Sequence, residues 1–419
     1  MFFSHKKSIV GLRKVAAALI ITVLAVFAWS CSNTAKAPGN IPDNEITQPL
    51  DSLMHTVFPD DNEPGAVVMV MRGDDIVFSK GYGQARLDRR LHMSDSVMLN
   101  VSSATKTYVT AGLLHLAEQG KLSLDQPLSD FFPEFNHDIF SKITISNVLT
   151  HTSGLPDKRP RNEVQWNEYV SEHPGTPFSA APDYLLYGRE DELTRFYEKL
   201  DTVLYEPGTK FDYQDAPYLL LPRVIERVTG EKFEDWMQKN VFEPAGLTEI
   251  HFAAQGDPTS NEAHGYIPAQ KDSPKNAFRS RNGKWDEYDY GEAPFFLTRA
   301  DNGIYTTPRD FAKWMHALYH GDVTSKVMLD SANRQYVHTK LHYIGYGLGL
   351  FVQEKPGLPK KVFHNTANGG FAIFEGAFPD DDLFYLIFTN RPDWNRLELA
   401  NKVDSIFKAH HWLDISVIQ

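Results

Sequence analysis

Ser103 and Lys106 are the first residues of this sequence whose types and spacing suggest chemistry, in the tetrad Ser103-Ala104-Thr105-Lys106. Residues three apart share one face of a helix, so the ammonium group of Lys106 can reach the hydroxyl of Ser103. A serine hydroxyl becomes a strong nucleophile when a base takes its proton, and a buried, neutral lysine can be that base. Backbone N–H groups at the helix start would stabilise an oxyanion. From the tetrad alone, an ordinary helix N-cap beside a solvated lysine is the more common explanation.

The elements that must position this pair are predicted from the spacing of apolar residues. Apolar runs at 65–70 and 76–80 flank Gly73-Asp74-Asp75 and predict a β-hairpin. Further strands are predicted at 345–352, 361–364, 371–378 and 383–389, with 379–382 as a second hairpin turn. Helices are predicted at 104–119, 218–228, 233–241, 309–319 and 397–410.

Strands therefore lie toward both ends of the chain, and helices occupy the middle. This order predicts an α/β (α+β) fold in which both chain ends build one antiparallel sheet flanked by helices. We expect a single domain over residues 50–410, with a mainly helical insertion at about 104–330. Two long polar stretches with scattered aromatic residues, 156–183 and 254–300 (the latter with Trp285), are candidates for shaping a substrate cleft.

Composition and missing motifs narrow the function. The 419 residues carry a net charge of −12, and no basic stripe suits nucleic-acid phosphates, so we expect no nucleic-acid partner. The sequence has no Gly-x-Ser-x-Gly elbow, no His-Glu-x-x-His and no glycine-rich phosphate loop. His410 and His411 lack a third nearby ligand. We therefore predict neither a cofactor nor a metal.

The N-terminus is typical of an exported protein. Lysines and arginines between residues 6 and 14 precede an apolar run, 15–29, that is short for a membrane span. The single cysteine, Cys31, follows directly and resembles a bacterial lipoprotein cleavage site. We predict a lipoprotein-type signal peptide at 1–30, lipidation of Cys31, a tether at 31–49, and a lipid-anchored location in the cell envelope. An uncut signal anchor, or an ordinary signal with an incidental cysteine, remains open.

Several downstream segments resemble landmarks of one enzyme family, in the same order along the chain. They are 101–108 (Val-Ser-Ser-Ala-Thr-Lys-Thr-Tyr), 143–155 with its His-Thr-Ser-Gly turn, 206–215 ending in Tyr213-Gln214-Asp215, 241–248, 263–266, 346–350, and His364-Asn365-Thr366 followed by Gly369-Gly370. Together they resemble the serine β-lactamase and penicillin-binding-protein family, particularly its class C-like members. The resemblance extends over about residues 50–395.

The resemblance implies a role for each matching residue. Ser103 would attack the substrate carbonyl, and Tyr213 would act as base and then acid, poised by Lys106. The backbone N–H groups of Ser103 and Ala367 would form the oxyanion hole. His364 stands where many members carry lysine and would line the cleft, orienting a substrate carboxylate or the Tyr213 proton.

Two residues depart from the family pattern. Asp215 replaces an asparagine, and a carboxylate only accepts hydrogen bonds whereas an amide also donates. We expect Asp215 to keep Lys106 charged and so to favour Tyr213 as the base. Thr366 replaces a glycine that lets substrate lie flat against a strand. Both changes argue more against β-lactam turnover than against hydrolase activity.

The sequence therefore predicts an exported serine hydrolase that cleaves an amide, ester or lactam carbonyl through an acyl-enzyme on Ser103. Peptidoglycan-like peptides, D-amino-acid peptides, small esters and β-lactams are the candidate substrates, and the lipid anchor implies a membrane partner. The alternative is a non-catalytic or slowly deacylating penicillin-binding or sensor lipoprotein on the same fold. We interpret His151, in the His-Thr-Ser-Gly turn, as a structural turn residue.

Overall fold

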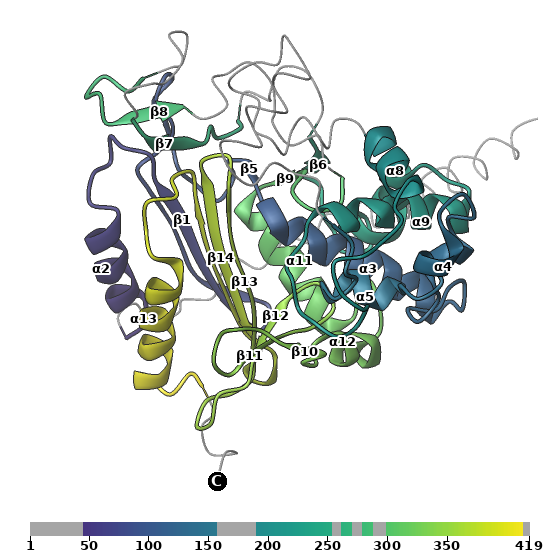
Figure 1. Cartoon of the computed structure of the whole chain (residues 1–419). Coiled ribbons are helices and arrows are strands. Elements are labelled where there is room, and N and C mark those ends of the chain that lie inside the picture. Colours follow the sequence, from purple (N-terminus) through teal and green to yellow (C-terminus); the bar gives the residue numbers. More distant parts are fainter. Residues whose placement is uncertain (1–44, 157–189, 254–260, 270–278, 288–298, 414–419) are drawn as a thin grey trace, which may run out of the picture. The chain divides into compact units, whose positions relative to one another are not determined.

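The computed structural model describes residues 45–156, 190–253, 261–269, 279–287 and 299–413 (Figure 1). Cys31, the predicted signal peptide, most of the predicted tether and most of the loops at 156–183 and 254–300 lie outside these ranges. Among the described residues, no helix combines the length and apolarity that a membrane crossing requires. The first described helix, α2 (Thr47–Val57), begins slightly before Leu50, where we expected folded structure to start.

An antiparallel sheet built from both ends of the chain confirms the predicted fold class. The eight strands run in the order β10-β11-β12-β13-β14-β15-β1-β2, and every neighbouring pair is antiparallel. The strands are β1 (Ala66–Arg72), β2 (Asp75–Tyr82), β10 (Val337–His338), β11 (Ile344–Tyr346), β12 (Phe351–Gln353), β13 (Lys361–Asn368), β14 (Phe371–Phe378) and β15 (Leu383–Thr389). The predicted hairpins β1–β2 and β14–β15 are both present.

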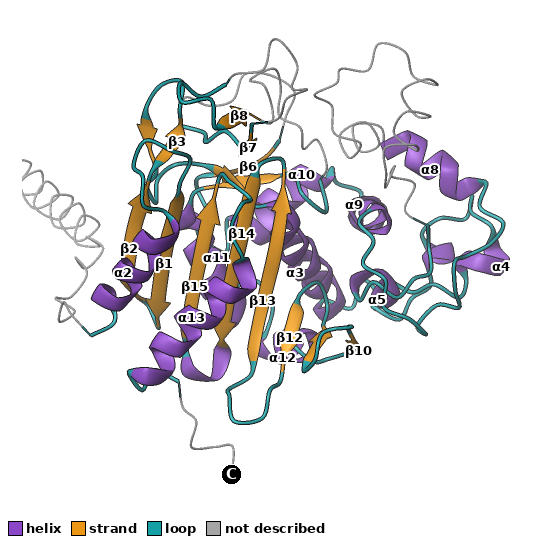
Figure 2. Cartoon of the chain, turned by 60° about the vertical axis from the view of Figure 1, so that its left-hand side comes forward, coloured by secondary structure: helices purple, strands orange, loops and turns teal. Residues whose placement is uncertain are grey.

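The central strands are apolar on both faces because each face packs against helices. In β1, Val67 and Met69 enter one core, while Val68 and Val70 enter the other. The second core contains residues of α2 and α13 (Arg396–Ala409), and the first contains residues of α3 (Thr105–Glu118) and α11 (Pro308–His320). Figures 1 and 2 show α2 and α13 on one side of the sheet and α3 and α11 on the other. A period of two along each strand therefore serves two separate cores.

The prediction of one continuous strand at 345–352 is wrong. This segment forms two strands, β11 and β12, which pair with each other around a turn at 347–350. Gly349 in this turn has φ +81°, and a Cβ there would lie 2.3 Å from Thr110 Oγ1 of α3. Only glycine fits so close an approach at positive φ, so packing against α3 turns the chain where alternation alone predicted continuity.

The remaining described helices and short strands lie mostly between β2 and β10. The helices are α4 (His137–Phe140), α5 (Ile145–Leu149), α8 (Glu190–Glu198), α9 (Leu220–Thr229), α10 (Phe233–Met237) and α12 (Lys326–Ala332). The single-turn helices are η1 (Ser102–Ala104), η2 (Leu128–Asp130), η3 (Ala216–Leu219), η4 (Gln238–Phe242) and η5 (Pro379–Asp381). The short strands are β3 (Gln84–Arg86), β4 (Leu91–His92), β5 (Leu99–Asn100), β6 (Ile250–Phe252), β7 (Tyr266–Pro268), β8 (Trp285–Glu287) and β9 (Ile304–Thr306).

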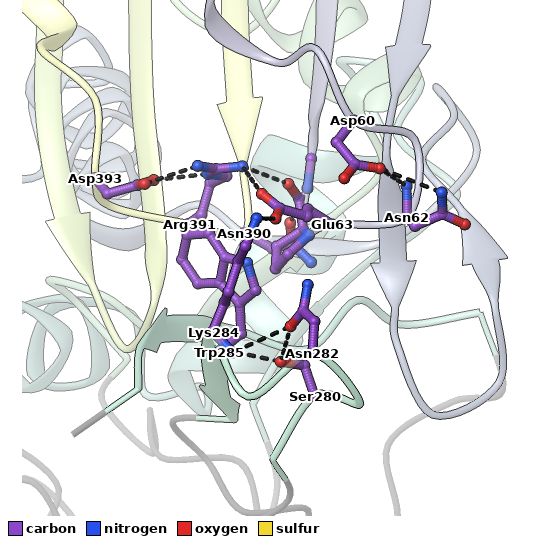
Figure 3. A network of polar contacts seen from close by, with 12 residues as sticks. Asp60, Asn62, Glu63, Ser280, Asn282, Lys284, Trp285, Asn390, Arg391 and Asp393 are labelled. Carbon is purple, nitrogen blue, oxygen red and sulfur yellow. Dashed lines mark hydrogen bonds and ion pairs between the residues drawn. The ribbon is translucent and has the colours of Figure 1, made fainter. Parts of the chain in front are cut away.

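One candidate cleft residue of the 254–300 stretch, Trp285, belongs instead to a structural contact. Its buried ring lies under the guanidinium of Arg391, 4.4 Å from the ring centroid. Arg391 also pairs with Asp393 at 2.6 Å, and Lys284 pairs with Glu63 at 2.6 Å (Figure 3). These contacts hold the paired strands β7 and β8 against the segments that precede β1 and follow β15. Trp285 therefore has a packing role.

Candidate active site

Ser103 lies at a tightly constrained junction between strand and helix. The side chain of Asn100, at the end of β5, accepts the N–H of Ser102 at 2.8 Å and donates to the carbonyl of Asn302 at 2.7 Å. Ser102 has φ +48°, a left-handed conformation that costs a non-glycine residue about 1–3 kcal/mol. The N-cap of α3 is Ala104, with no side-chain cap. Ser103 is therefore not an ordinary N-cap, and its orientation is set by contacts outside the helix.

Lys106, one turn into the helical segment, is fully buried and charged. Its Nζ donates to Asp215 Oδ1 at 2.6 Å and lies over the rings of Tyr213 and Tyr218, at 5.0 and 5.3 Å from their centroids. Burial alone would lower the pKa of Lys106. The negative charge of Asp215, aided by Tyr213 and Asp301, outweighs burial and holds the pKa well above its usual range. Lys106 is therefore a fixed cation, and it cannot be the neutral base that the tetrad by itself suggested.

Tyr213 joins this pair from the segment that precedes η3. Its phenol is half-buried and lies close enough to Ser103 and Lys106 for both groups to lower its pKa. Burial raises the pKa of Tyr213, Lys106 opposes that effect, and the charge of Asp215 adds to it, so that the net shift is upward. The phenol thus lies near both the hydroxyl of Ser103 and the ammonium of Lys106, since both affect its pKa.

Strand β13 lies beside Ser103. The backbone N–H of Ser103 donates to Thr366 Oγ1 at 3.3 Å, so a side-chain hydroxyl occupies one of the two N–H groups expected to form the oxyanion hole. Ala367, which carries the second expected N–H, is exposed and pairs with Ala372 of β14. The residue predicted to keep substrate from lying flat against the strand thus also bonds directly to the nucleophile's own backbone.

His364 differs from its expected placement. Its ring is 1% exposed, and Nδ1 lies 3.0 Å from Glu375 Oε1 on the neighbouring strand β14. Its Nε2 has no hydrogen-bond partner among the described residues. A residue that lines an open cleft would be more accessible, so the structure does not support a simple replacement of the family lysine by an exposed histidine. The carboxylate of Glu375 already takes the partner position that a substrate carboxylate would need.

Two further polar residues near the nucleophile escaped the sequence analysis. Ser103 Oγ lies 3.5 Å from Asn302 Oδ1, and Asn302 Nδ2 donates to Asp301 Oδ2 at 2.7 Å. Both residues are buried just ahead of β9, and the charge of Asp301 helps to raise the pKa of Lys106. Asp301-Asn302-Gly303 has the composition of an ordinary turn, so no sequence signal set these residues apart.

This arrangement can transfer a proton between a serine and a phenol beside a fixed positive charge. Such a group of interacting residues titrates as a unit, with apparent pKa values that belong to the cluster. Serine acylation needs a proton acceptor, a nearby cation that favours the acceptor's anionic form, and backbone N–H donors for the oxyanion. The described residues supply the first two directly, and they supply a backbone N–H that Thr366 covers.

Comparisons with known proteins identify the family of this chain. The profile of the Beta-lactamase family matches residues 44–405. The "Putative penicillin-binding protein PbpX" of Bacillus subtilis (strain 168) is 30% identical over 338 residues, which cover 80% of this chain and 73% of that protein.

Two solved structures share the fold. The octameric penicillin-binding protein homologue from Pyrococcus abyssi has a TM-score of 0.67 at 22% identity, covering 86% of this chain and 77% of that one. The D-amino acid amidase from Ochrobactrum anthropi SV3, in complex with L-phenylalanine amide, has a TM-score of 0.66 at 20% identity, covering 86% and 99%. At these identities the two structures establish a common architecture. Because the profile spans nearly all of the described fold and the Bacillus relative matches 80% of the chain, this protein belongs to the beta-lactamase family of serine hydrolases.

Proposed function

We propose that this protein is an exported, lipid-anchored hydrolase that forms an acyl-enzyme on Ser103, with Tyr213 moving the proton and Lys106 remaining charged. One observation carries the proposal: the Lys106 ammonium bonds to Asp215 at 2.6 Å and lies 5.0 Å from the ring centroid of Tyr213, whose pKa both Lys106 and Ser103 lower. A lysine with this partner cannot serve as the base, and Asn302, whose Oδ1 accepts the Ser103 hydroxyl at 3.5 Å, is a neutral amide that cannot take the proton. The Tyr213 phenol is therefore the base that we propose.

Acylation balances as one proton transfer and one bond exchange. The Tyr213 phenolate takes the proton of Ser103 Oγ while Oγ bonds to the substrate carbonyl carbon. The resulting oxyanion accepts hydrogen bonds from the N–H groups of Ser103 and Ala367, after the hydroxyl of Thr366 gives up the first of them. Tyr213 then returns the proton to the leaving amine or alcohol as the carbon–heteroatom bond breaks, which leaves the acyl-enzyme.

Deacylation repeats these steps with water. The Tyr213 phenolate takes a proton from a water molecule, the hydroxide attacks the ester carbonyl, and the proton returns to Ser103 Oγ as the acid product leaves. Lys106 keeps its charge throughout and stabilises the phenolate each time it forms. Apart from the substrate and this water molecule, neither half-reaction requires a group from outside the chain.

The proposed substrate class rests on the relatives and on two residues of the site. The Bacillus relative is named a putative penicillin-binding protein, and one structural neighbour is a D-amino acid amidase. These names support an amide, peptide or ester carbonyl, including peptidoglycan-like and D-amino-acid peptides. Asp215 offers only acceptors where the family amide would also donate, and His364 is already paired with Glu375. Both observations favour substrates other than β-lactams.

A specific observation also supports the alternative of a penicillin-binding or sensor lipoprotein that is non-catalytic or deacylates slowly. Thr366 Oγ1 accepts the Ser103 N–H at 3.3 Å, so each tetrahedral intermediate must compete with an internal hydroxyl for that donor. Losing one oxyanion-hole donor costs about 10²- to 10³-fold in kcat in other serine hydrolases. Such a loss would leave acylation measurable but turnover slow.

A substrate panel with a Ser103→Ala control tests the proposal. The panel contains a nitrophenyl ester, nitrocefin and a D-Ala-D-Ala peptide, and intact-mass measurement follows adducts with a fluorophosphonate probe and with penicillin. We expect ester turnover by the parental protein and a loss of several orders of magnitude in Ser103→Ala. Ester turnover by Ser103→Ala at the parental rate would contradict the mechanism. A penicillin adduct that forms and persists favours the sensor, whereas the fluorophosphonate adduct, which is stable on any active serine, reports only that Ser103 is nucleophilic. A protein that forms no adduct with either probe favours a binding role.

Export and lipidation rest on the sequence around Cys31 and need their own measurement. Metabolic labelling with palmitate in a bacterial host should mark the parental protein and leave Cys31→Ala unlabelled. Fractionation should place the labelled protein with membranes. An unlabelled parental protein in the soluble fraction would contradict this part of the proposal while leaving the chemistry at Ser103 intact.

A further inference from the structure

His151 holds three consecutive residues of the segment that carries Tyr213. Its backbone carbonyl accepts the N–H of Asp212 at 2.9 Å, and its Nδ1 accepts the N–H of Gln214 at 3.2 Å. Between these two bonds, the imidazole stacks on the ring of Tyr213, with centroids 4.0 Å apart and planes 29° apart. The sequence analysis interpreted His151 as a turn residue only, and that interpretation missed these contacts.

The backbone at His151 suggests that the side chain is the reason for this residue. Its φ is +54°, in the left-handed region that glycine or asparagine occupies at lower cost. A turn that needed only this backbone shape would be better served by either of those residues. The ring is 2% exposed and also contacts Tyr218 and Tyr346, each with centroids 4.9 Å away. Packing of the His151 side chain around Tyr213 thus offsets the backbone strain at His151.

The protonation state of His151 agrees with these contacts. Accepting the Gln214 N–H requires an unprotonated Nδ1, so the neutral ring carries its proton on Nε2. Burial lowers the pKa of His151 well below its usual range, and the nearby charge of Lys106 lowers it further, whereas Asp215 opposes the shift. A protonated ring would lose the Gln214 bond and place a second cation beside Lys106.

We propose that His151 is a positioning residue for the reaction: its Nδ1 and its ring fix the Tyr213 phenol in the geometry that exchanges a proton with Ser103. This inference rests on the proposed role of Tyr213 as the proton carrier. His151 does not touch Ser103 in any described contact, so it acts through Tyr213 and not on the substrate. A displacement of about 1 Å at a proton-transfer group can cost on the order of 10²-fold in rate.

Two variants separate the two contacts. His151→Asn tolerates positive φ and keeps an acceptor near the Gln214 N–H, but it removes the ring. His151→Phe keeps a ring against Tyr213 but removes the acceptor. Val148→Ala, at a buried position of α5 three residues earlier, is the matched control, because it weakens packing next to the turn and leaves both His151 and Tyr213 in place. For each variant, kcat and KM are measured on a nitrophenyl ester at a temperature well below the melting temperature of that variant.

We expect each His151 variant to lower kcat by about 10- to 100-fold with KM within a few-fold of the parental value, while Val148→Ala keeps the parental kcat. The decisive measurement is a double-mutant cycle with Tyr213→Phe. If His151 acts through Tyr213, adding His151→Asn to Tyr213→Phe has no further effect on kcat. Multiplied losses in the double variant, or His151 losses no larger than that of Val148→Ala, would overturn the inference. Tyr213→Phe at the parental rate would instead overturn the proposed function, and this inference with it.

Discussion

Replacing Asp215 with asparagine is expected to destabilise the fold and to move the pH dependence of hydrolysis toward lower pH. Asp215 is the direct partner of a fully buried ammonium, Lys106, at 2.6 Å, and its own side chain is 11% exposed. Asparagine has nearly the same shape and keeps an oxygen acceptor, so the change removes a charge and little else. It also restores the residue that the family resemblance led us to expect at this position.

The size of the stability change follows from the burial of the pair. Breaking a buried ion pair costs about 3–5 kcal/mol when one charge is left alone. The asparagine carbonyl returns a hydrogen bond to a charged donor, which is worth about 1.5–3 kcal/mol. The net loss is therefore about 2 kcal/mol. Because the pKa of Lys106 is raised by folding, this stabilisation is fully present below the unfolded-state lysine pKa of about 10.4 and is lost only as pH rises through the higher folded value.

Although Asp215→Asn lowers stability, we expect it to raise the rate of hydrolysis at neutral pH. Burial raises the pKa of Tyr213 most, Lys106 opposes this, and the negative charge of Asp215 raises it further. A neighbouring charge shifts a pKa by about 1–3 units, so removing this one should move the basic limb of kcat/KM about one unit toward lower pH. At a fixed neutral pH, a larger fraction of Tyr213 is then phenolate, and the ester is hydrolysed faster by the molecules that remain folded.

The assay combines thermal unfolding at pH 7 with nitrophenyl ester hydrolysis between pH 6 and 9. Asp215→Asn should lower the melting temperature by about 2–4 °C. Asp215→Leu, which removes both charge and acceptor, should lower it by more. An Asp215→Asn protein with the parental pH profile would refute the view that this charge controls Tyr213, and a limb displaced toward higher pH would refute it more strongly.

Three further predictions use the same structure. For the parental protein, kcat/KM on the ester should rise between pH 7 and pH 10, because burial raises the pKa of the Tyr213 phenol; a flat profile would exclude it as the base. Thr366→Gly should release the Ser103 N–H and raise kcat/KM several-fold. Thr366→Val, which keeps the bulk of the side chain, should not raise kcat/KM. An unchanged or lower kcat/KM in the glycine variant would show that the Thr366 hydroxyl does not obstruct the site. Tyr108→Phe should raise the free energy of unfolding by about 1 kcal/mol, because the buried Tyr108 hydroxyl has no partner among the described residues. Tyr218→Phe should lower the free energy of unfolding by about 1 kcal/mol, because it removes a 2.7 Å bond to a backbone carbonyl. Equal effects of the two variants in chemical denaturation would contradict this reasoning.

The strand and helix pattern was predictable where one period dominates. The two long hairpins and the amphipathic helix α11 lie within a few residues of their predicted bounds, because burial on defined faces leaves a clear apolar repeat in the sequence. The error at 345–352 arose because alternation continues through a turn that exists only where Gly349 meets α3. No local pattern records an approach between segments more than two hundred residues apart.

The sequence by itself predicted the family and the fold class, and it marked Ser103, Lys106 and Tyr213 as candidates, because ordered motifs and apolar periodicity are local properties of the chain. Tertiary structure decided the surroundings of those residues. Contact with Asp215 makes Lys106 a fixed cation, contact with Thr366 covers the Ser103 N–H, and His151 holds the segment on both sides of Tyr213. Charge state, donor occupancy and side-chain orientation depend on neighbours brought from distant parts of the chain, and so they appear only when the chain is folded.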